Sequence, residues 1–334
     1  MKFSIIVPFH NAQGDIERCV SSLLQQNVAN KEILLIDDHS EDKTAEICQR
    51  MAENHPEIFF LHSTGSGVSA ARNTGLECAT GDIIGFCDSD DSYEPYTLEI
   101  VQEAFRSFCA DAVVGGIRRV KDSEAGFQTI RVSTLSFDRV CSFQDLLSLT
   151  FTHGEAIMGS CWNKFFKKSL IESVRFDETL THCEDMHFVF RILSHHRDNV
   201  CAILAKSLYN YSIKSIGSVT RPKNKADLFE TDGTFRYISA LRAIERDCPL
   251  TDLQRKYLKD LKTMFAINGL WTLRCYRGAA YEKQITLIKN GFSSFLYGRP
   301  VLPKIKGIAK LLLWHIGRIR MTVFGQGKGI KEKL

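Results

Sequence analysis

Short apolar segments alternate with amphipathic segments through the first 115 residues of the chain. Continuous apolar runs lie at 3–7, 32–36, 58–61, 83–87 and 112–115, and a stretch with helical spacing of apolar residues follows each of the first four. Strands and helices that alternate with short connections predict an α/β domain, with a mostly parallel central sheet flanked by helices. Ligands of such sheets bind at the carboxyl ends of the strands, so we expect functional residues directly after the strands.

Three carboxylates follow the fourth apolar run within four residues. Asp88, Asp90 and Asp91 come directly after the segment Ile83-Ile84-Gly85-Phe86-Cys87. Acids this close repel one another unless a cation lies among them, and carboxylate oxygens are the ligands that Mg²⁺ and Mn²⁺ prefer. The pattern therefore predicts a site for a divalent metal ion and a diphosphate. The alternative is a polar turn that caps the next helix.

Polar residues at two other places are expected to reach the same edge of the sheet. Asp37 and Asp38 follow the second apolar run, and Arg72 lies about one turn into the third helical stretch. An aspartate for a base or ribose, carboxylates for an ion and an arginine nearby suit a nucleoside diphosphate with its metal. These residues therefore predict a nucleotide-binding edge.

A glycine-rich turn offers a rival interpretation. The segment Gly65-Ser66-Gly67-Val68-Ser69-Ala70 fits the dinucleotide fingerprint, follows a predicted strand and opens a predicted helix, as in an NAD-dependent oxidoreductase. Two features disfavour that rival. The fingerprint normally occupies the first strand–helix turn, where this chain has no glycine before Gly14, and a dinucleotide site needs one acid on the ribose rather than a cluster.

Two later motifs supply further candidate residues. Trp162, Asn163 and Lys164 place an aromatic ring, an amide and a cation together, which suits a buried strand, a sugar-binding platform or both. Glu184 and Asp185 begin an amphipathic stretch, where the helix dipole favours a carboxylate. A carboxylate at this position could also take the proton from a hydroxyl group that attacks a sugar carbon.

The strand–helix pattern ends near residue 221, so we predict a domain boundary there. The α/β domain is expected to span 1–222, a helical extension 223–298 and a basic amphipathic tail 299–334. From Arg299 onward the only acidic residue is Glu332, and the tail includes a tryptophan-bearing helical pattern at 308–320. That pattern is too short to span a membrane but suits an anionic membrane surface; the alternative is a helix docked on the body of the protein.

Cysteine usage bears on the compartment. The eleven cysteines are scattered without a C-x-x-C pair, which is typical of reduced thiols in a cytosolic protein. The chain shows no pattern of a secretory signal at its start. We therefore expect a cytoplasmic protein, peripheral on the inner face of the cytoplasmic membrane if the tail binds lipid, with no nucleic-acid partner.

With these motifs in order, residues 3–221 resemble a family 2 glycosyltransferase of the GT-A fold, of the kind that builds bacterial lipopolysaccharide and capsular polysaccharide. The resemblance rests on the segments 4–8, 36–40, 67–75, 88–91, 162–164 and 184–185. It implies a Rossmann-like domain at 1–222 that binds a nucleotide sugar and carries out catalysis. The C-terminal helices lie outside the resemblance.

The resemblance implies roles for residues on the donor side. Pro8 and Asp38 would line the pocket for the nucleotide base, with Arg72 beside them. The motif Asp88-Ser89-Asp90-Asp91 occupies the DXD position, which implies that its three aspartates bind Mn²⁺ or Mg²⁺ and the donor diphosphate. His39 stands where glycine is more usual in the family.

On the acceptor side, Asp185 matches the proposed base that deprotonates the acceptor hydroxyl. Direct displacement would then invert the anomeric carbon. Trp162, Asn163, Lys164 and Glu184 are the expected acceptor-side residues. The implied activity is transfer of a sugar, with a lean to a UDP-sugar donor, to a hydroxyl of a cell-surface glycan or a lipid-linked acceptor, one sugar in each encounter. The rivals are the oxidoreductase, a sugar nucleotidyltransferase that would release pyrophosphate, and a sugar-binding protein without catalysis.

Overall fold

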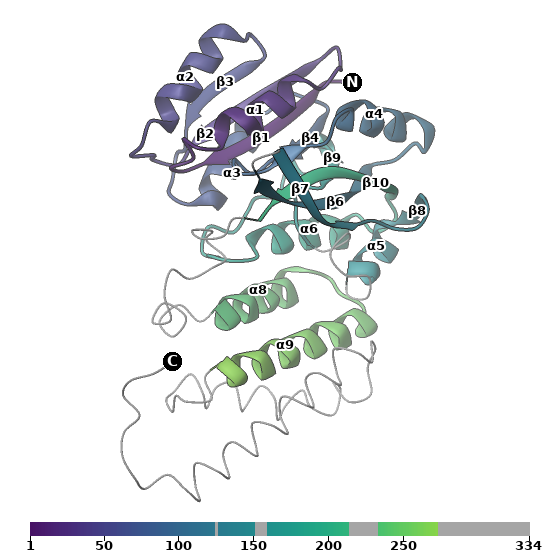
Figure 1. Cartoon of the computed structure of the whole chain (residues 1–334). Helices are drawn as coiled ribbons and strands as arrows, with labels where there is room; N and C mark the ends of the chain where they lie inside the picture. Colours follow the sequence, from purple (N-terminus) through teal and green to yellow (C-terminus); the bar gives the residue numbers. More distant parts are fainter. Residues whose placement is uncertain (124–125, 151–158, 214–232, 273–334) are drawn as a thin grey trace, which may run out of the picture. The chain divides into compact units, whose positions relative to one another are not determined.

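Figure 1 shows the computed structural model of the chain, which describes residues 1–123, 126–150, 159–213 and 233–272. The chain divides into two units. The first contains Met1–Lys223 with Arg242–Pro249, and the second contains Asn224–Leu241 with Leu250–Leu334. The domain boundaries expected from the sequence stay predictions, and the basic tail at 299–334 lies outside the described residues.

The N-terminal part of the sheet consists of four parallel strands. They are β1 (Phe3–Phe9), β2 (Lys31–Asp37), β3 (Ile58–His62) and β4 (Ile83–Phe86), in the order β3-β2-β1-β4. Every residue of β1 is buried, as expected for a central strand that helices cover on both faces. The four strands and their parallel pairing confirm the first part of the sequence prediction.

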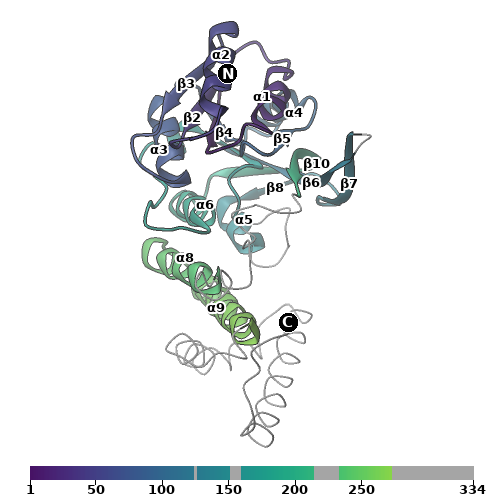
Figure 2. The same cartoon turned by 60° about the vertical axis from the view of Figure 1, so that its left-hand side comes forward.

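Helices cover both faces of these strands. Alternate residues of β1, among them Phe3, Ile5 and Val7, share a core with α1 (Ile16–Leu24), α2 (Thr44–Asn54) and α4 (Thr97–Ser107). The opposite face of β1 packs on α3 (Val68–Cys78), where a Cβ on Gly75 would lie 2.4 Å from the Cγ2 of Ile6. Figure 2 shows α1 and α3 on opposite sides of β2 and β4.

The remainder of the sheet is mixed rather than parallel. From β4 onward the order is β4-β9-β6-β10-β5, and β9 (Lys164–Lys167) runs antiparallel to both of its neighbours. Strand β6 (Ala112–Ser123) pairs in parallel with β10 (Val200–Ser212), and β5 (Ser92–Tyr93) runs antiparallel to β10. The expected central sheet flanked by helices is confirmed; its strands are parallel in β1 to β4 and in the pair β6–β10, and the other pairings are antiparallel.

Residues 121–139, where the strand–helix pattern of the sequence blurs, contain most of a hairpin. Strand β7 (Gly126–Ser133) pairs antiparallel with the end of β6, and β8 (Arg139–Ser142) pairs with β10. The described side chains of β7 are exposed or half-buried on both faces, so they lack the alternation that would reveal a strand in the sequence.

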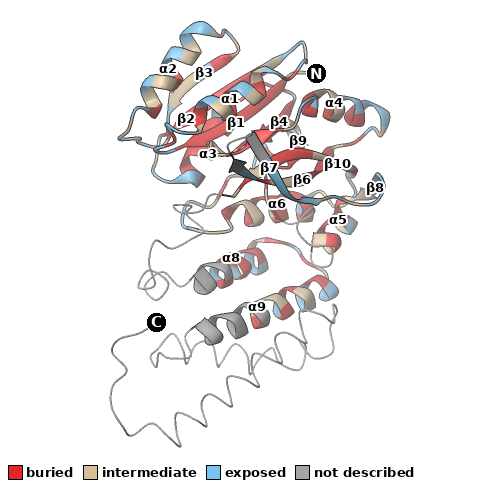
Figure 3. Cartoon of the chain, in the orientation of Figure 1, coloured by how far each residue is buried: buried red, intermediate tan, exposed pale blue. Residues whose placement is uncertain are grey.

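The remaining helices include α5 (Phe143–Thr150), a 3₁₀ turn (Lys168–Leu170) and α6 (Glu184–His195). Helix α6 lies on the same sheet face as α3, since Phe188 packs edge-on against Phe86 of β4. The helical extension was expected to contain two or three helices between Asp227 and Lys289, and its described residues form α8 (Gly233–Asp247) and α9 (Asp252–Thr272). Among the described residues, no helix combines the length and hydropathy needed to cross a bilayer. In Figure 3 the buried residues concentrate on the sheet strands.

Candidate active site

The carboxyl ends of β1, β2 and β4 meet at one edge of the sheet. The parallel register brings their following loops, residues 10–11, 38–40 and 87–91, to the same place, which we call the acidic edge. Backbone bonds continue the ladder into these loops: Asp38 N donates to the Phe9 carbonyl at 2.8 Å, and Cys87 N donates to the Ile6 carbonyl at 3.0 Å. The acidic edge is therefore a direct product of strand pairing.

Asp38 lies between three segments of the acidic edge. Its Oδ1 accepts a hydrogen bond from the backbone N of Gly67 at 2.8 Å, and its carbonyl accepts one from His10 Nδ1 at 2.7 Å. Pro8 is buried one strand position before the end of β1, opposite Ile36. His39 has a φ of +59°, in the left-handed region that favours glycine. Pro8 and Asp38 are thus neighbours at the end expected for a base pocket.

Arg72 connects the acidic edge to α6. This buried side chain in α3 binds Asp88 Oδ1 through Nη2 at 2.9 Å and Glu184 Oε1 through Nη1 at 2.7 Å. Its guanidinium also lies over the ring of Phe176, 5.3 Å from the ring centroid. Glu184 is separated from Arg72 by 112 positions in the sequence. The arginine therefore joins Asp88 to the start of α6.

The three clustered aspartates have different surroundings. Asp91 is buried, and its two oxygens accept hydrogen bonds from the Tyr209 hydroxyl at 2.8 Å and from Ser212 N at 2.7 Å. Burial, together with the charges of Asp90 and Asp88, raises the pKa of Asp91 well above its ordinary value. The structure thus gives Asp91 a supporting role in the loop, and metal binding by Asp91 stays a prediction.

Asp88 and Asp90 are the aspartates that a cation can approach. Both are half-buried, and the Asp88 side chain keeps 28% of its exposure even with Arg72 bound. The Asp90 carbonyl accepts a hydrogen bond from Arg18 Nη2 at 2.7 Å, which ties the loop to α1. Two carboxylates on a loop that Arg18 holds against α1 form a donor set suited to a hard divalent ion. Such an ion keeps open coordination positions for phosphate oxygens.

Asp185 stands at the start of α6 beside this group. Its Oδ1 accepts a hydrogen bond from Met186 N at 2.7 Å. Burial, reinforced by the negative charge of Glu184, raises the pKa of Asp185 to about 7, although Arg72 acts in the opposite direction. A carboxyl group with a pKa near neutrality can accept a proton at working pH, as a general base must.

The Trp162-Asn163-Lys164 motif lies mainly inside the fold. Lys164 is fully buried, and its Nζ donates to the Ser160 carbonyl at 2.7 Å and to Asn163 Oδ1 at 2.9 Å. Burial lowers the pKa of Lys164 to about 8. Trp162 stacks on Tyr209 with ring centroids 4.4 Å apart. The structural interpretation of this motif is confirmed, and contact with an acceptor stays a prediction.

Sequence reasoning missed two residues that support the site. Tyr209 in β10 donates to Asp91 and accepts a hydrogen bond from Asp88 N at 3.1 Å. Arg18 bridges Asp15, the Asp90 carbonyl and the hydroxyl of Ser212. Both residues come from elements that pack against the loop only in the folded chain, so no local pattern marks them.

Comparison with known proteins identifies the family. The model of the family described as "Glycosyl transferase family 2" matches residues 4–174, which is about half of the chain and includes the acidic edge. The chain belongs to glycosyl transferase family 2. Membership of this family favours sugar transfer over the oxidoreductase and nucleotidyltransferase alternatives. The glycine-rich turn, Gly65 to Gly67, joins β3 and α3 and donates to Asp38.

Several relatives of the chain are bacterial. It is 32% identical over 180 residues to "Glycosyltransferase GlyA" of Streptococcus pneumoniae, covering 53% of this chain and 26% of that protein. It is 29% identical over 274 residues to "Putative glycosyltransferase EpsH" of Bacillus subtilis, covering 80% and 74% of the two chains. The chain spans about a quarter to just over half of the length of three of the curated relatives that it matches.

Solved structures show the same fold at low sequence identity. S. aureus TarS residues 1–349 in complex with UDP-GlcNAc matches with a TM-score of 0.62 and 18% identity, covering 96% of this chain and 88% of that one. A mannosyltransferase of Pyrobaculum calidifontis in complex with GDP-Man and Mn²⁺ matches with a TM-score of 0.51 and 16% identity, covering 98% and 88%. These likenesses confirm the GT-A fold.

Proposed function

We propose that this glycosyltransferase is a metal-dependent, inverting enzyme that moves a sugar from a nucleotide-sugar donor, a UDP-sugar in the first instance, to a hydroxyl of a cell-surface glycan or lipid-linked acceptor. The observation that carries the proposal is the double ion pair of Arg72 with Asp88 and Glu184. It brings the acids that suit a metal–diphosphate site next to Asp185, whose pKa suits a base.

The donor would lie along the acidic edge. In this proposal Pro8 and Asp38 would border the nucleotide base, and Asp88 and Asp90 would hold a Mn²⁺ or Mg²⁺ ion near the diphosphate. When bound, that ion would neutralise charge that develops on the departing nucleoside diphosphate. The solved complexes with UDP-GlcNAc and with GDP-Man and Mn²⁺ support a nucleotide-sugar donor and a divalent ion in proteins of the same fold.

Asp185 would act on the acceptor. Its carboxylate takes the proton of the acceptor hydroxyl while that oxygen forms a bond to the anomeric carbon. The bond from that carbon to the diphosphate oxygen breaks at the same time, and its electron pair leaves with the nucleoside diphosphate. Attack from the face opposite the leaving group inverts the anomeric configuration. Arg72 keeps Glu184 paired, so the helix start that carries Asp185 stays fixed.

The acceptor is proposed to belong to the bacterial cell surface, as a lipopolysaccharide, capsular or related polysaccharide. The chain is 26% identical over 327 residues to "Minor teichoic acid biosynthesis protein GgaB" of Bacillus subtilis, which supports that class of acceptor. We also propose a cytoplasmic enzyme that meets the inner membrane surface through residues 305–334. The intact chain should float with anionic liposomes, and the chain without residues 305–334 should not. Equal flotation of the two proteins would contradict the membrane role.

A donor screen tests the proposed reaction. Purified enzyme is incubated with a panel of UDP-, GDP- and other nucleotide sugars, with Mn²⁺, Mg²⁺ or EDTA, and the release of nucleoside diphosphate is measured. We expect metal-dependent turnover of one donor, which Asp90→Asn abolishes and which Asp198→Asn, a change of an exposed aspartate outside the site, leaves intact. Turnover that is equal in EDTA would contradict metal dependence. The anomeric configuration of the product, determined by NMR, tests inversion.

A further inference from the structure

Strands β6 and β7 place two arginines directly opposite each other. Arg119 of β6 pairs in register with Arg131 of β7 in the antiparallel ladder, and we call these two residues the arginine pair. Directly opposite side chains point to the same face of a sheet, where like charges destabilise the pairing of the strands. Arg131 is exposed and has no ion-pair partner among the described residues. An anion bound on this face would relieve the repulsion between the two guanidinium groups.

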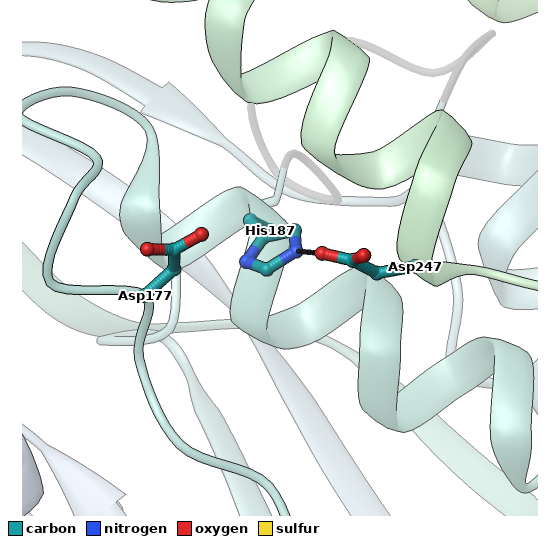
Figure 4. A group of neighbouring side chains, drawn as sticks. All are labelled: Asp177, His187 and Asp247. Carbon is teal, nitrogen blue, oxygen red and sulfur yellow. Dashed lines mark hydrogen bonds and ion pairs between the residues drawn. The ribbon is translucent and has the colours of Figure 1, made fainter.

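The charged cluster beside α6 differs from the arginine pair, because its charges are compensated within the protein. Figure 4 shows His187 between the carboxylates of Asp177 and Asp247. Arg246 pairs with Asp247 at 2.6 Å and lies 3.7 Å from Asp177 Oδ2. The positive charge of Arg191 also acts on His187. Contacts within the protein therefore explain this cluster, and it needs no ligand.

Two aromatic rings extend from the arginine pair. The guanidinium of Arg119 lies over the ring of Tyr211 in β10, 5.2 Å from the ring centroid. Tyr211 in turn stacks on Trp162, with ring centroids 5.6 Å apart. Both aromatic residues are half-buried, so part of each side chain is open to solvent. We call these two residues the aromatic surface; such rings offer a large apolar area against which the C–H groups of a pyranose ring can pack.

The Tyr211 end of the aromatic surface borders the acidic edge. The next residue, Ser212, donates its backbone N to Asp91 Oδ1 at 2.7 Å. Burial raises the pKa of the Tyr211 hydroxyl, and the charges of Asp91 and Asp90 add to this rise. A sugar on the aromatic surface would therefore lie beside the loop that is proposed to hold the donor.

The Trp162 end of the aromatic surface is close to the proposed base. The segment that leads to Trp162 packs on α6, since Gly159 lies so close to the side chain of Met186 that a Cβ would not fit. Met186 directly follows Asp185 in α6. Burial raises the pKa of the Cys161 thiol, and the charge of Asp185 contributes to this rise. The aromatic surface thus lies between Asp185 and the arginine pair.

We propose that the aromatic surface and the arginine pair bind an acceptor glycan that carries an anionic group, a phosphate in the first instance. This inference rests on the proposed sugar transfer and names the chemical class of its acceptor. A pyranose ring would pack on the aromatic surface, and the phosphate would accept hydrogen bonds from the arginine pair. Phosphate has enough oxygens to accept from both guanidinium groups, whereas a carboxylate suits a single arginine fork. A neutral glycan would gain nothing from the arginine pair.

Binding of matched polysaccharides, with EDTA and without a donor, tests this site. The full-length protein is titrated by calorimetry with dextran, dextran phosphate and carboxymethyl dextran, which share one pyranose backbone. We expect dextran phosphate to bind at least about tenfold more tightly than dextran, with carboxymethyl dextran between them. Equal binding of dextran and dextran phosphate would overturn the proposal, and tighter binding of carboxymethyl dextran would overturn the choice of phosphate.

Replacement of the arginine pair tests which residues bind the anionic group. Arg119→Gln combined with Arg131→Gln should lower the affinity for dextran phosphate to the affinity for dextran. The matched control is Arg50→Gln combined with Arg106→Gln, which removes the same charge from exposed positions of α2 and α4 and should bind as the wild type does. Equal losses in the two double variants would overturn the assignment, because they would show that net charge alone attracts the polysaccharide.

Replacement of Tyr211 tests the role of the aromatic surface. Tyr211→Leu should bind dextran phosphate about tenfold more weakly and should bind inorganic polyphosphate, which has no pyranose ring, as the wild type does. Unchanged binding of dextran phosphate by this variant would show that the site recognises charge alone and would overturn its role in acceptor binding. None of these measurements involves donor or metal, so they can fail while the proposed sugar transfer is confirmed, and the reverse.

Discussion

The acidic edge and the start of α6 face the same site, but their residues are brought together over very different distances in the sequence. The acidic edge is produced by neighbouring parallel strands, in which Asp38 and Asp88 simply follow β2 and β4. The start of α6 reaches the site through long-range contacts, above all the ion pair between Arg72 and Glu184, 112 positions apart. Changes at the acidic edge should therefore act on chemistry, and changes in the long-range contacts should act on both chemistry and stability.

The largest effect on turnover is expected when Asp185, the proposed base, is replaced. Asp185→Asn keeps the shape of the side chain but cannot accept a proton, so turnover should fall by about 10³, within the usual contribution of a general base. Donor binding, measured by calorimetry with a non-hydrolysable donor analogue, should change less than threefold. Asp198→Asn is the matched control. Turnover within tenfold of the wild type would remove Asp185 from the proposed mechanism.

The second prediction concerns Arg72, whose ion pairs join the acidic edge to the start of α6. Arg72→Gln leaves Asp88 and Glu184 without their buried cation, and breaking a buried ion pair in this way costs about 3 to 5 kcal/mol of unfolding free energy. Turnover should fall by about 10² because Asp88 and the start of α6 lose their common anchor. Urea denaturation and the donor assay measure the two losses.

Arg72→Lys sharpens this result, since it keeps one charge but cannot reach both carboxylates as a fork. It should recover part of the stability and little of the turnover. Arg50→Gln, on the exposed face of α2, is the control. Unchanged stability of Arg72→Gln would contradict the role of the double ion pair.

The pH dependence of turnover distinguishes Asp185 from the other acids. Because its pKa is raised to about 7, the fraction able to accept a proton falls as pH drops below neutrality. We expect kcat/KM to decrease by about tenfold for each pH unit below that value. The residual activity of Asp185→Asn should lack this decrease. A wild-type profile that stays flat down to pH 5 would contradict a base with a raised pKa.

The smallest effect concerns the support of the acidic edge. Tyr209→Phe removes the hydroxyl that joins Asp91 Oδ2 to the backbone of Asp88. Leaving a buried acceptor without its donor costs about 1 to 3 kcal/mol, and turnover should fall only about three- to tenfold. Tyr96→Phe, at an exposed tyrosine, is the control. A loss of turnover above 100-fold with unchanged stability would instead place Tyr209 against the substrate.

Much of the fold was predictable because its signals are local. The strands β1 to β4 are apolar runs because they are buried in the core. In α1, apolar residues recur at helical spacing because one face of the helix, with Ile16, Cys19 and Leu23, is buried. The second part of the sheet was less predictable. Strand β9 enters between β4 and β6 from a distant part of the chain, and its partners depend on packing that no local pattern encodes.

The motif at 88–91 also combines features that the sequence predicted with features that it did not predict. Three aspartates within four residues were expected to share one role, but Asp91 is buried against Tyr209 and Ser212, whereas Asp88 and Asp90 stay accessible. The difference arises because Tyr209 and Ser212 of β10 donate hydrogen bonds to Asp91. Likewise, Asn163 and Lys164 form a buried polar network, although as isolated letters they suit a surface contact equally well.

By itself, the sequence determined the family, the parallel strands β1 to β4 and the position of the acids at their carboxyl ends, because hydrophobic periodicity and parallel pairing are properties of short segments. Only the tertiary structure decided which acids stay accessible, that Arg72 joins Asp88 to Glu184, and that His187 lies between two carboxylates. Burial and charge pairing depend on neighbours that are distant in the chain, and these neighbours set the chemistry of each carboxylate.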